Sequence, residues 1–195
     1  LGTRSVAIGR RALSTQNFTT STEVYNVAIG FNAGKNVTTG IYNTLVGALS
    51  GDALTDADNN VALGWGTLST DTLGSRSVAI GRSALQSQNF TTATDSYNTA
   101  VGYSAGLSVT TGLSNTLVGG QTGEAITTGS YNSFVGARAG DAINTGSNNV
   151  AIGWATLSAD TKGDKTTAIG RSALGSQNFT TATDSYNTAV GYSAG

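Results

Sequence analysis

The chain has 195 residues and a formal net charge of −1, and it contains no His, Cys, Met or Pro. Charged residues make up 11% of the chain, about half the usual share, and no cluster of Lys and Arg provides the field that nucleic acids require. Without His or Cys there is no Ser-His-Asp triad, Cys nucleophile or His-bearing zinc site, and no apolar stretch is long enough for membrane insertion.

A five-residue phrase ending in glycine recurs along the chain and marks the predicted strands. In chain order the phrases are residues 5–9, 26–30, 43–47, 60–64, 77–81, 98–102, 115–119, 132–136, 149–153, 166–170 and 187–191. Their last residues, the phrase glycines, are 17 residues apart, with three intervals of 21. Such a period predicts an all-β parallel β-solenoid (β-roll) of 17-residue coils with 21-residue variants.

Fixed positions around the phrase glycine predict how each coil is filled. The residue before the glycine is always Ile, Val or Leu, and we expect it to point inward, so that Val101 stacks on Ile80 and Val118. Five leucines four residues after the glycine would add to this core: Leu13, Leu68, Leu85, Leu157 and Leu174. The Ala that usually stands two residues before the glycine would then lie on the exposed face, where it suits packing against another chain.

Asparagine occupies one position in most phrases, four residues before the glycine. Stacked coils would place these amides in a ladder in which each bonds the next coil's Asn or a turn backbone group. The predicted ladder residues are Asn26, Asn43, Asn60, Asn98, Asn115, Asn132, Asn149 and Asn187. A second glycine ten residues after the first, as at Gly112, predicts another corner of the coil.

A longer period lies above the single coil. Residues 82–106 and 171–195 differ only at Gln86 and Gly175. We expect one β-solenoid region over residues 1–195, with superrepeats at about 9–80, 81–169 and 170–195. The chain starts at Leu1 and has no capping sequence, so we expect it to be a fragment of a longer fibre.

The phrases resemble those of known fibrous proteins. Ser5-Val6-Ala7-Ile8-Gly9 is similar to the head repeat of trimeric autotransporter adhesins, and residues 98–106 and 187–195 look like repeats of bacteriophage tail fibres. The resemblance implies a left-handed β-roll assembled as a homotrimer and located outside the cell, on a virion tail fibre or a bacterial surface. Adhesin coils are usually about 14 residues long, whereas these have 17 or 21.

Aromatic and arginine residues follow several phrase glycines and are the predicted ligand-binding residues. They are Trp65, Trp154, Tyr103, Tyr192, Arg10, Arg82 and Arg171. Exposed aromatic rings at these positions would bind a surface glycan, or alternatively pack between chains or across coils. Each long coil also carries an acid, Glu23, Asp95 or Asp184, which would pair with a basic residue and tie the four extra residues to the rod.

Other chemistries have weaker support in the sequence. The acidic cluster Asp52, Asp56 and Asp58 is not kept in the second superrepeat, so we expect solvated acids there and no catalytic or calcium site. Adjacent threonines such as Thr110-Thr111 face opposite sides of a strand, which disfavours an ice-binding array. We therefore expect no enzyme activity, metal or cofactor.

The sequence thus predicts a structural or adhesive fibre shaft, a rigid spacer and attachment surface for host-cell recognition. Its partners would be its own copies and a cell-surface glycan or receptor. The alternatives are a subunit of a self-assembling extracellular filament and an ice-binding solenoid.

Overall fold

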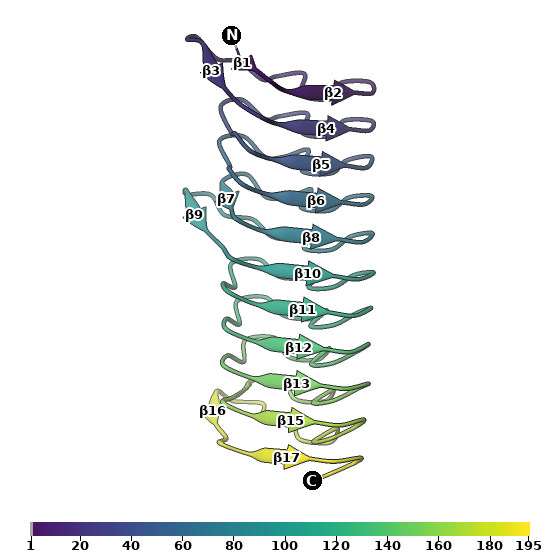
Figure 1. Ribbon diagram of the computed structural model, residues 1–195. Coiled ribbons are helices and arrows are strands. Elements are labelled where there is room, and N and C mark those ends of the chain that lie inside the picture. Colours follow the sequence, from purple (N-terminus) through teal and green to yellow (C-terminus); the bar gives the residue numbers. More distant parts are fainter. Residues whose placement is uncertain (1) are drawn as a thin grey trace.

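Eleven short strands, one from each phrase, stack in a single parallel sheet that runs the length of the molecule (Figure 1). The computed structural model describes residues 2–195. The strands of the sheet are β2 (Val6–Ile8), β4 (Val27–Ile29), β5 (Thr44–Val46), β6 (Val61–Leu63), β8 (Val78–Ile80), β10 (Thr99–Val101), β11 (Thr116–Val118), β12 (Ser133–Val135), β13 (Val150–Ile152), β15 (Thr167–Ile169) and β17 (Thr188–Val190).

The strands pair in register, so Val101 lies between Ile80 and Val118. Parallel pairing of consecutive phrases means that every coil makes a full turn and returns to the same place one layer further on. The predicted all-β parallel solenoid of 17-residue coils is confirmed, and no helix occurs within residues 2–195.

Three pairs of two-residue strands mark the 21-residue coils. They are β1 (Gly2–Thr3) with β3 (Thr22–Glu23), β7 (Gly74–Ser75) with β9 (Thr94–Asp95), and β14 (Gly163–Asp164) with β16 (Thr183–Asp184). All three lie on the side of the stack where the sheet strands begin, at the left in Figure 1. The extra residues of the long coils therefore form three bulges on the same side of the rod.

The predicted orientation of the phrase side chains is wrong. The central residue of the internal strands is buried, as at Ala28, Leu45 and Phe134, whereas the residue before the phrase glycine is on the outside, with Ile8 57% and Ile152 40% exposed. The reason is the asparagine: its amide is buried, and alternation along the strand then places the residue two positions later inside. The alanines therefore line the core, and the aliphatic row faces outward.

The core is filled from two walls, and in most coils a large side chain on one wall faces a small residue on the other. One wall is the sheet, and the other is the return segment, the residues about two to eight positions after each phrase glycine. Ala151 in the sheet is matched by Leu157 in the return segment, and both are buried. Phe134 is matched by Gly140, where an added Cβ would lie 2.3 Å from the ring. The leucines predicted to fill the core are all buried.

The phrase glycine is required by the close approach of successive coils. Gly102 has φ = +143°, and a Cβ there would lie 2.3 Å from the carbonyl oxygen of Gly119 in the next coil. No side chain fits between the two backbones. Any other residue at this position would combine an unfavourable backbone conformation with a backbone clash.

The asparagine ladder runs through the interior. The Nδ2 of Asn115 donates to the carbonyl oxygen of Gly129 (2.9 Å), and its Oδ1 accepts from the backbone N–H of Asn132 (3.0 Å). The same two bonds recur along the ladder, so each amide joins the strand to the turn and one coil to the next. Asn187, in the last coil, is exposed and bonds Gln177 instead.

Candidate functional site

The predicted ligand-binding residues lie on one corner of the coil, directly after the phrase glycines. Because consecutive coils are in register, they form two three-residue ladders, Trp65–Arg82–Tyr103 and Trp154–Arg171–Tyr192, which we call the corner ladders. Arg10 and Phe31 lie at the same corner near the N-terminus. The aromatic members are all exposed, from 44% at Phe31 to 73% at Tyr192.

Cations and rings contact one another within the corner ladders. The guanidinium carbon of Arg82 is 5.2 Å from the ring centroid of Trp65, and that of Arg171 is 4.9 Å from Trp154 and 5.8 Å from Tyr192. Such contacts contribute about 0.5–1 kcal/mol at exposed sites. The arginines therefore hold the rings in place across coils, while much of each ring stays open to solvent.

A second exposed ladder, which sequence reasoning missed, lies five residues before the phrase glycines. It contains Tyr25, Tyr42, Tyr97, Tyr131 and Tyr186, with Arg4, Arg76 and Lys165 at the same position of the long coils. The rings of Tyr25 and Tyr42 stack at 5.6 Å. The signal was visible in the sequence as a tyrosine directly before the ladder asparagine.

The three cations at the tyrosine position form ion pairs with acidic residues of the bulges. Arg4 pairs with Glu23 (2.8 Å), Arg76 with Asp95 (2.9 Å) and Lys165 with Asp184 (2.7 Å). The Lys165 ammonium lowers the pKa of Asp184, and the hydrogen bond from Lys165 to Asp184 raises the pKa of the lysine. The expected ion pairs between bulge and rod are thus present, and Arg10, Arg82 and Arg171 belong to the corner instead.

The second and third bulges each have a buried polar anchor that sequence reasoning missed. Asp71 accepts hydrogen bonds from the backbone N–H of Gly74 and Phe90 and from Nε2 of Gln88 (2.6 Å), and Gln88 accepts one from Asn98. Asp160 and Gln177 repeat the arrangement. Asp71 and Gln88 are fully buried, so this network fixes the coil on which a bulge is stacked. The pattern was detectable as an Asp–Gln pair separated by one 17-residue coil.

The outer sheet face consists of the residues one and three positions before each phrase glycine. The position directly before the glycine is Ile, Val or Leu in every coil, and the position three residues before it is Val, Thr or Ser, so the face carries no charge. Among residues 2–195, every exposed large hydrophobic residue lies on this face, at the corner directly after a phrase glycine, or at the tyrosine position five residues before one. The apolar surface is therefore concentrated on one side of the rod.

The acidic cluster is not a converging site. Asp56 accepts a hydrogen bond from Thr39, and Asp58 accepts one from the backbone N–H of Ile41. Burial raises the pKa of Asp52, whose buried Oδ1 has no hydrogen-bond partner. Across residues 2–195 no group of three acidic, His or Cys side chains is placed to share a metal ion.

The adjacent threonines lie outside the strands. The hydroxyls of Thr38 and Thr110 donate to carbonyl oxygens of the next coil, at 3.3 and 3.1 Å. These hydroxyls therefore stabilise stacking, which accounts for the recurrence of threonine at this corner.

No protein-family model, curated protein or solved structure matches this chain. The assignment that the fold supports is a β-solenoid repeat protein of about eleven turns. Within residues 2–195 no helix has the length and apolar character needed to cross a bilayer.

Proposed function

We propose that the chain is a segment of the shaft of a homotrimeric fibre, of the kind found in phage tail fibres and bacterial surface adhesins. It acts as a stiff extracellular spacer and attachment surface for host-cell recognition. The observation that carries this proposal is the uncharged outer sheet face, on which an Ile, Val or Leu stands directly before the phrase glycine in all eleven coils. The phrase resemblance adds the left-handed coil and the threefold assembly.

The amount of exposed apolar surface suits association with identical rods. On the outer sheet face and in the tyrosine ladder five residues before the phrase glycines, eleven large hydrophobic side chains are at least a third exposed: Val6, Ile8, Tyr25, Ile29, Tyr42, Tyr97, Tyr131, Val135, Ile152, Tyr186 and Val190. With roughly 150–250 Å² for each tyrosine side chain and less for each Val and Ile, their exposed parts amount to on the order of 1,000 Å². A standard interface takes about 800 Å² from each partner, so this face is large enough to be one.

Stiffness follows from the backbone pattern. Each coil is joined to the next by the sheet ladder, by turn hydrogen bonds such as Gly106 N–H to the carbonyl of Thr122 (2.9 Å), and by the asparagine ladder. Bending the rod would stretch all of these bonds on one side at once. Stability is then shared between neighbouring coils, which suits a spacer of variable length.

Mass measurement by light scattering tests the assembly. We expect the 195-residue chain to have three times the mass of one chain. Replacing Val135 and Ile152 by Lys on the outer sheet face should give a folded monomer, because charges would be buried between chains. The matched control makes the same Lys substitution at Thr128 and Thr145, which are exposed directly before Gly129 and Gly146, and it should remain trimeric.

A wild-type chain that is monomeric at high micromolar concentration would overturn the trimeric shaft. Species that grow with concentration without a fixed mass would instead support the filament. A control pair that dissociates the trimer as completely as the Val135 and Ile152 pair would show that the outer sheet face is not the interface.

A further inference from the structure

The first corner ladder, Trp65–Arg82–Tyr103, places one cation between two exposed aromatic side chains, Trp65 at 45% and Tyr103 at 55%. Each of its three coils is stacked between two others, so this exposure belongs to the interior of the rod. The ladder lies just beyond the ends of the sheet strands, at the right in Figure 1, whereas the tyrosine ladder lies before their start. The interface proposed for the trimer therefore does not need this corner.

The guanidinium of Arg82 is held in place but has no acidic partner. Its carbon lies 5.2 Å from the ring centroid of Trp65, and within residues 2–195 its N–H groups form no hydrogen bond or ion pair. Arg76, directly before the same phrase, is instead paired with Asp95 at 2.9 Å. A guanidinium over an aromatic ring keeps its N–H edge free, and this edge is the fork that binds a carboxylate or phosphate.

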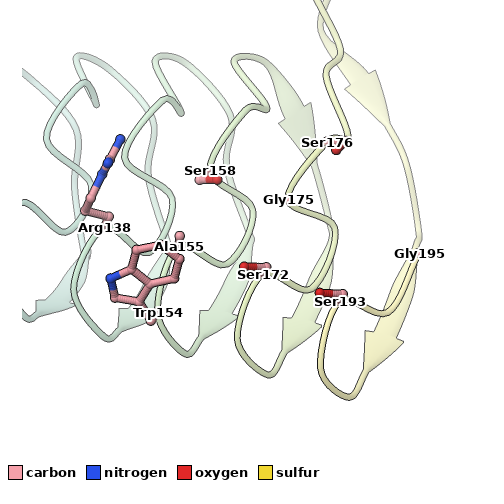
Figure 2. Close-up of a pocket in the computed structure, with 9 residues that line it drawn as sticks. All are labelled: Arg138, Trp154, Ala155, Ser158, Ser172, Gly175, Ser176, Ser193 and Gly195. Atoms are coloured by element: carbon pink, nitrogen blue, oxygen red, sulfur yellow. The ribbon is translucent and has the colours of Figure 1, made fainter.

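The surroundings of Arg82 favour an anionic ligand. In its own coil and the two coils on either side, the four residues after each phrase glycine include no other charged residue. The second ladder differs, because Arg138, which is paired with Asp141, lies one coil before Trp154 (Figure 2). The first ladder thus presents a single positive charge on an otherwise uncharged corner, and that charge attracts an anion.

The space beside Tyr103 suits a flat ring. The same position in the next coil is Gly120, where an added Cβ would meet nothing within 4 Å. No side chain from that position covers the ring of Tyr103, so one side of it is open to a ligand. Adjacent coils are about 4.8 Å apart, so an anion on Arg82 and a ring packed against Tyr103 can belong to one sugar unit.

Other anionic partners fit this corner less well. The strands from β4 to β15 in the long sheet are each paired on both sides, so no free strand edge is available to an extended peptide. A nucleic acid would need a cluster of cations, whereas Arg82 is alone. A small ligand with one anionic group and one ring matches the three residues of the ladder.

We propose that the first corner ladder binds a pyranose that carries a carboxylate or phosphate group, with the anion on the Arg82 guanidinium and the sugar ring against Tyr103. This inference rests on the proposed attachment role and names the kind of glycan that the attachment surface recognises. The site is formed within one chain, so it does not require the trimer.

Two-dimensional NMR on the ¹⁵N-labelled 195-residue chain tests the site through the indole N–H of Trp65. The chain has two tryptophans, so Trp154→Phe assigns this resonance. Glucuronic acid, N-acetylneuraminic acid and glucose 6-phosphate should shift it, whereas glucose and N-acetylglucosamine should not. Tighter binding of the phosphate ester identifies a phosphorylated glycan as the source of the ligand, and tighter binding of the carboxylates identifies a glycan with uronic or sialic acids.

Substitutions separate the site from the net charge of the rod. Arg82→Gln should weaken binding about tenfold or more, because a charge-assisted hydrogen-bond pair is lost, and Tyr103→Ala should weaken it about fivefold. The matched control Arg138→Gln removes the same charge from an arginine that already has a carboxylate partner, and it should leave the affinity unchanged. Unchanged circular dichroism shows that each variant is folded.

The proposal is overturned if no acidic sugar shifts the Trp65 resonance at about 10 mM, or if glucose shifts it equally. It is also overturned if inorganic phosphate or a short glutamate peptide binds as tightly as the acidic sugars. An equal loss of affinity in Arg138→Gln and Arg82→Gln would reduce the effect to net charge and overturn it as well. None of these results bears on the trimer, which the mass measurement tests separately.

Discussion

Exchanging a large side chain between the two walls of the core is the sharpest test of how a coil is filled. Phe134→Ala removes a fully buried ring and should cost about 3–5 kcal/mol. Gly140→Leu places a side chain where even a Cβ lies 2.3 Å from that ring, and should cost about 3 kcal/mol or more. The double variant recreates the pair found at Ala151 and Leu157, and should recover most of the loss.

The residual cost of the double variant has an identified source. Leu157 has φ = +53°, so a leucine tolerates the left-handed conformation here at about 1–2 kcal/mol. The preceding coil, with Leu117 and Gly123, should also accept the change. The coil with Leu45 and Gly51 has the same two residue types, and it is already followed by a coil with Ala62 and Leu68. We therefore expect a coupling energy of at least about 3 kcal/mol between the two substitutions.

Urea unfolding followed by circular dichroism, at one fixed protein concentration, measures all four proteins of this cycle. The double variant should have a midpoint close to that of the wild type, with both single variants well below it. If the two losses simply add, or if either single variant is neutral, the two walls do not share one volume and the proposed packing is wrong.

Three further predictions concern polar groups. Asn132→Ala should lower the free energy of unfolding by about 2–4 kcal/mol, because it leaves buried hydrogen-bonding partners on two coils unpaired. Asn187→Ala, in the exposed last coil, should lower it much less. Equal losses of unfolding free energy for the two variants, measured by urea unfolding, would contradict the ladder. Asp52→Asn should raise Tm by about 1–2 °C at pH 7, because burial raises the pKa of Asp52 and its ionisation then favours the unfolded chain. The gain should vanish below the ordinary pKa of 3.8, and a gain that persists there in fluorimetry scans would contradict this explanation. Because the pKa of Asp184 is lowered, its ion pair with Lys165 stabilises the third bulge above pH 3.8 and is lost as pH falls through the lower folded value, while the raised pKa of Lys165 keeps the pair up to and beyond pH 10.5. Asp184→Asn and Lys165→Gln should therefore speed proteolysis within residues 178–184 at pH 7.5 without a change in Tm. A lower Tm with no faster cleavage of the bulge would refute this.

Local periodicity accounts for what could be predicted. A phrase glycine every 17 residues leaves one arrangement in which all the glycines, asparagines and leucines find like neighbours, and that is a parallel stack. The ladder of Asn115 and its counterparts followed from the same reasoning, because an amide repeated once per coil meets its own copy. The corner ladders were also predictable, because Trp65, Arg82 and Tyr103 each follow a phrase glycine directly and stacked coils bring these positions together.

The direction of the strand side chains could not be predicted, because a three-residue strand offers both faces. The choice between Ile152 and Ala151 as the inward residue depends on the size of the space opposite, and in that coil the space is filled by Leu157 from the return segment. The buried Asp71–Gln88 network was missed for a related reason, since burial of a carboxylate becomes evident only when its backbone donors on another coil are known.

The sequence by itself determined the period, the register, the positions of the three bulges and the glycines that let backbones meet. These are properties of nearest neighbours, and each repeat carries them. Only the tertiary structure decided which residues face out, and so which side of the rod is apolar. Those features depend on how two walls of a coil divide a fixed volume, which no single repeat specifies alone.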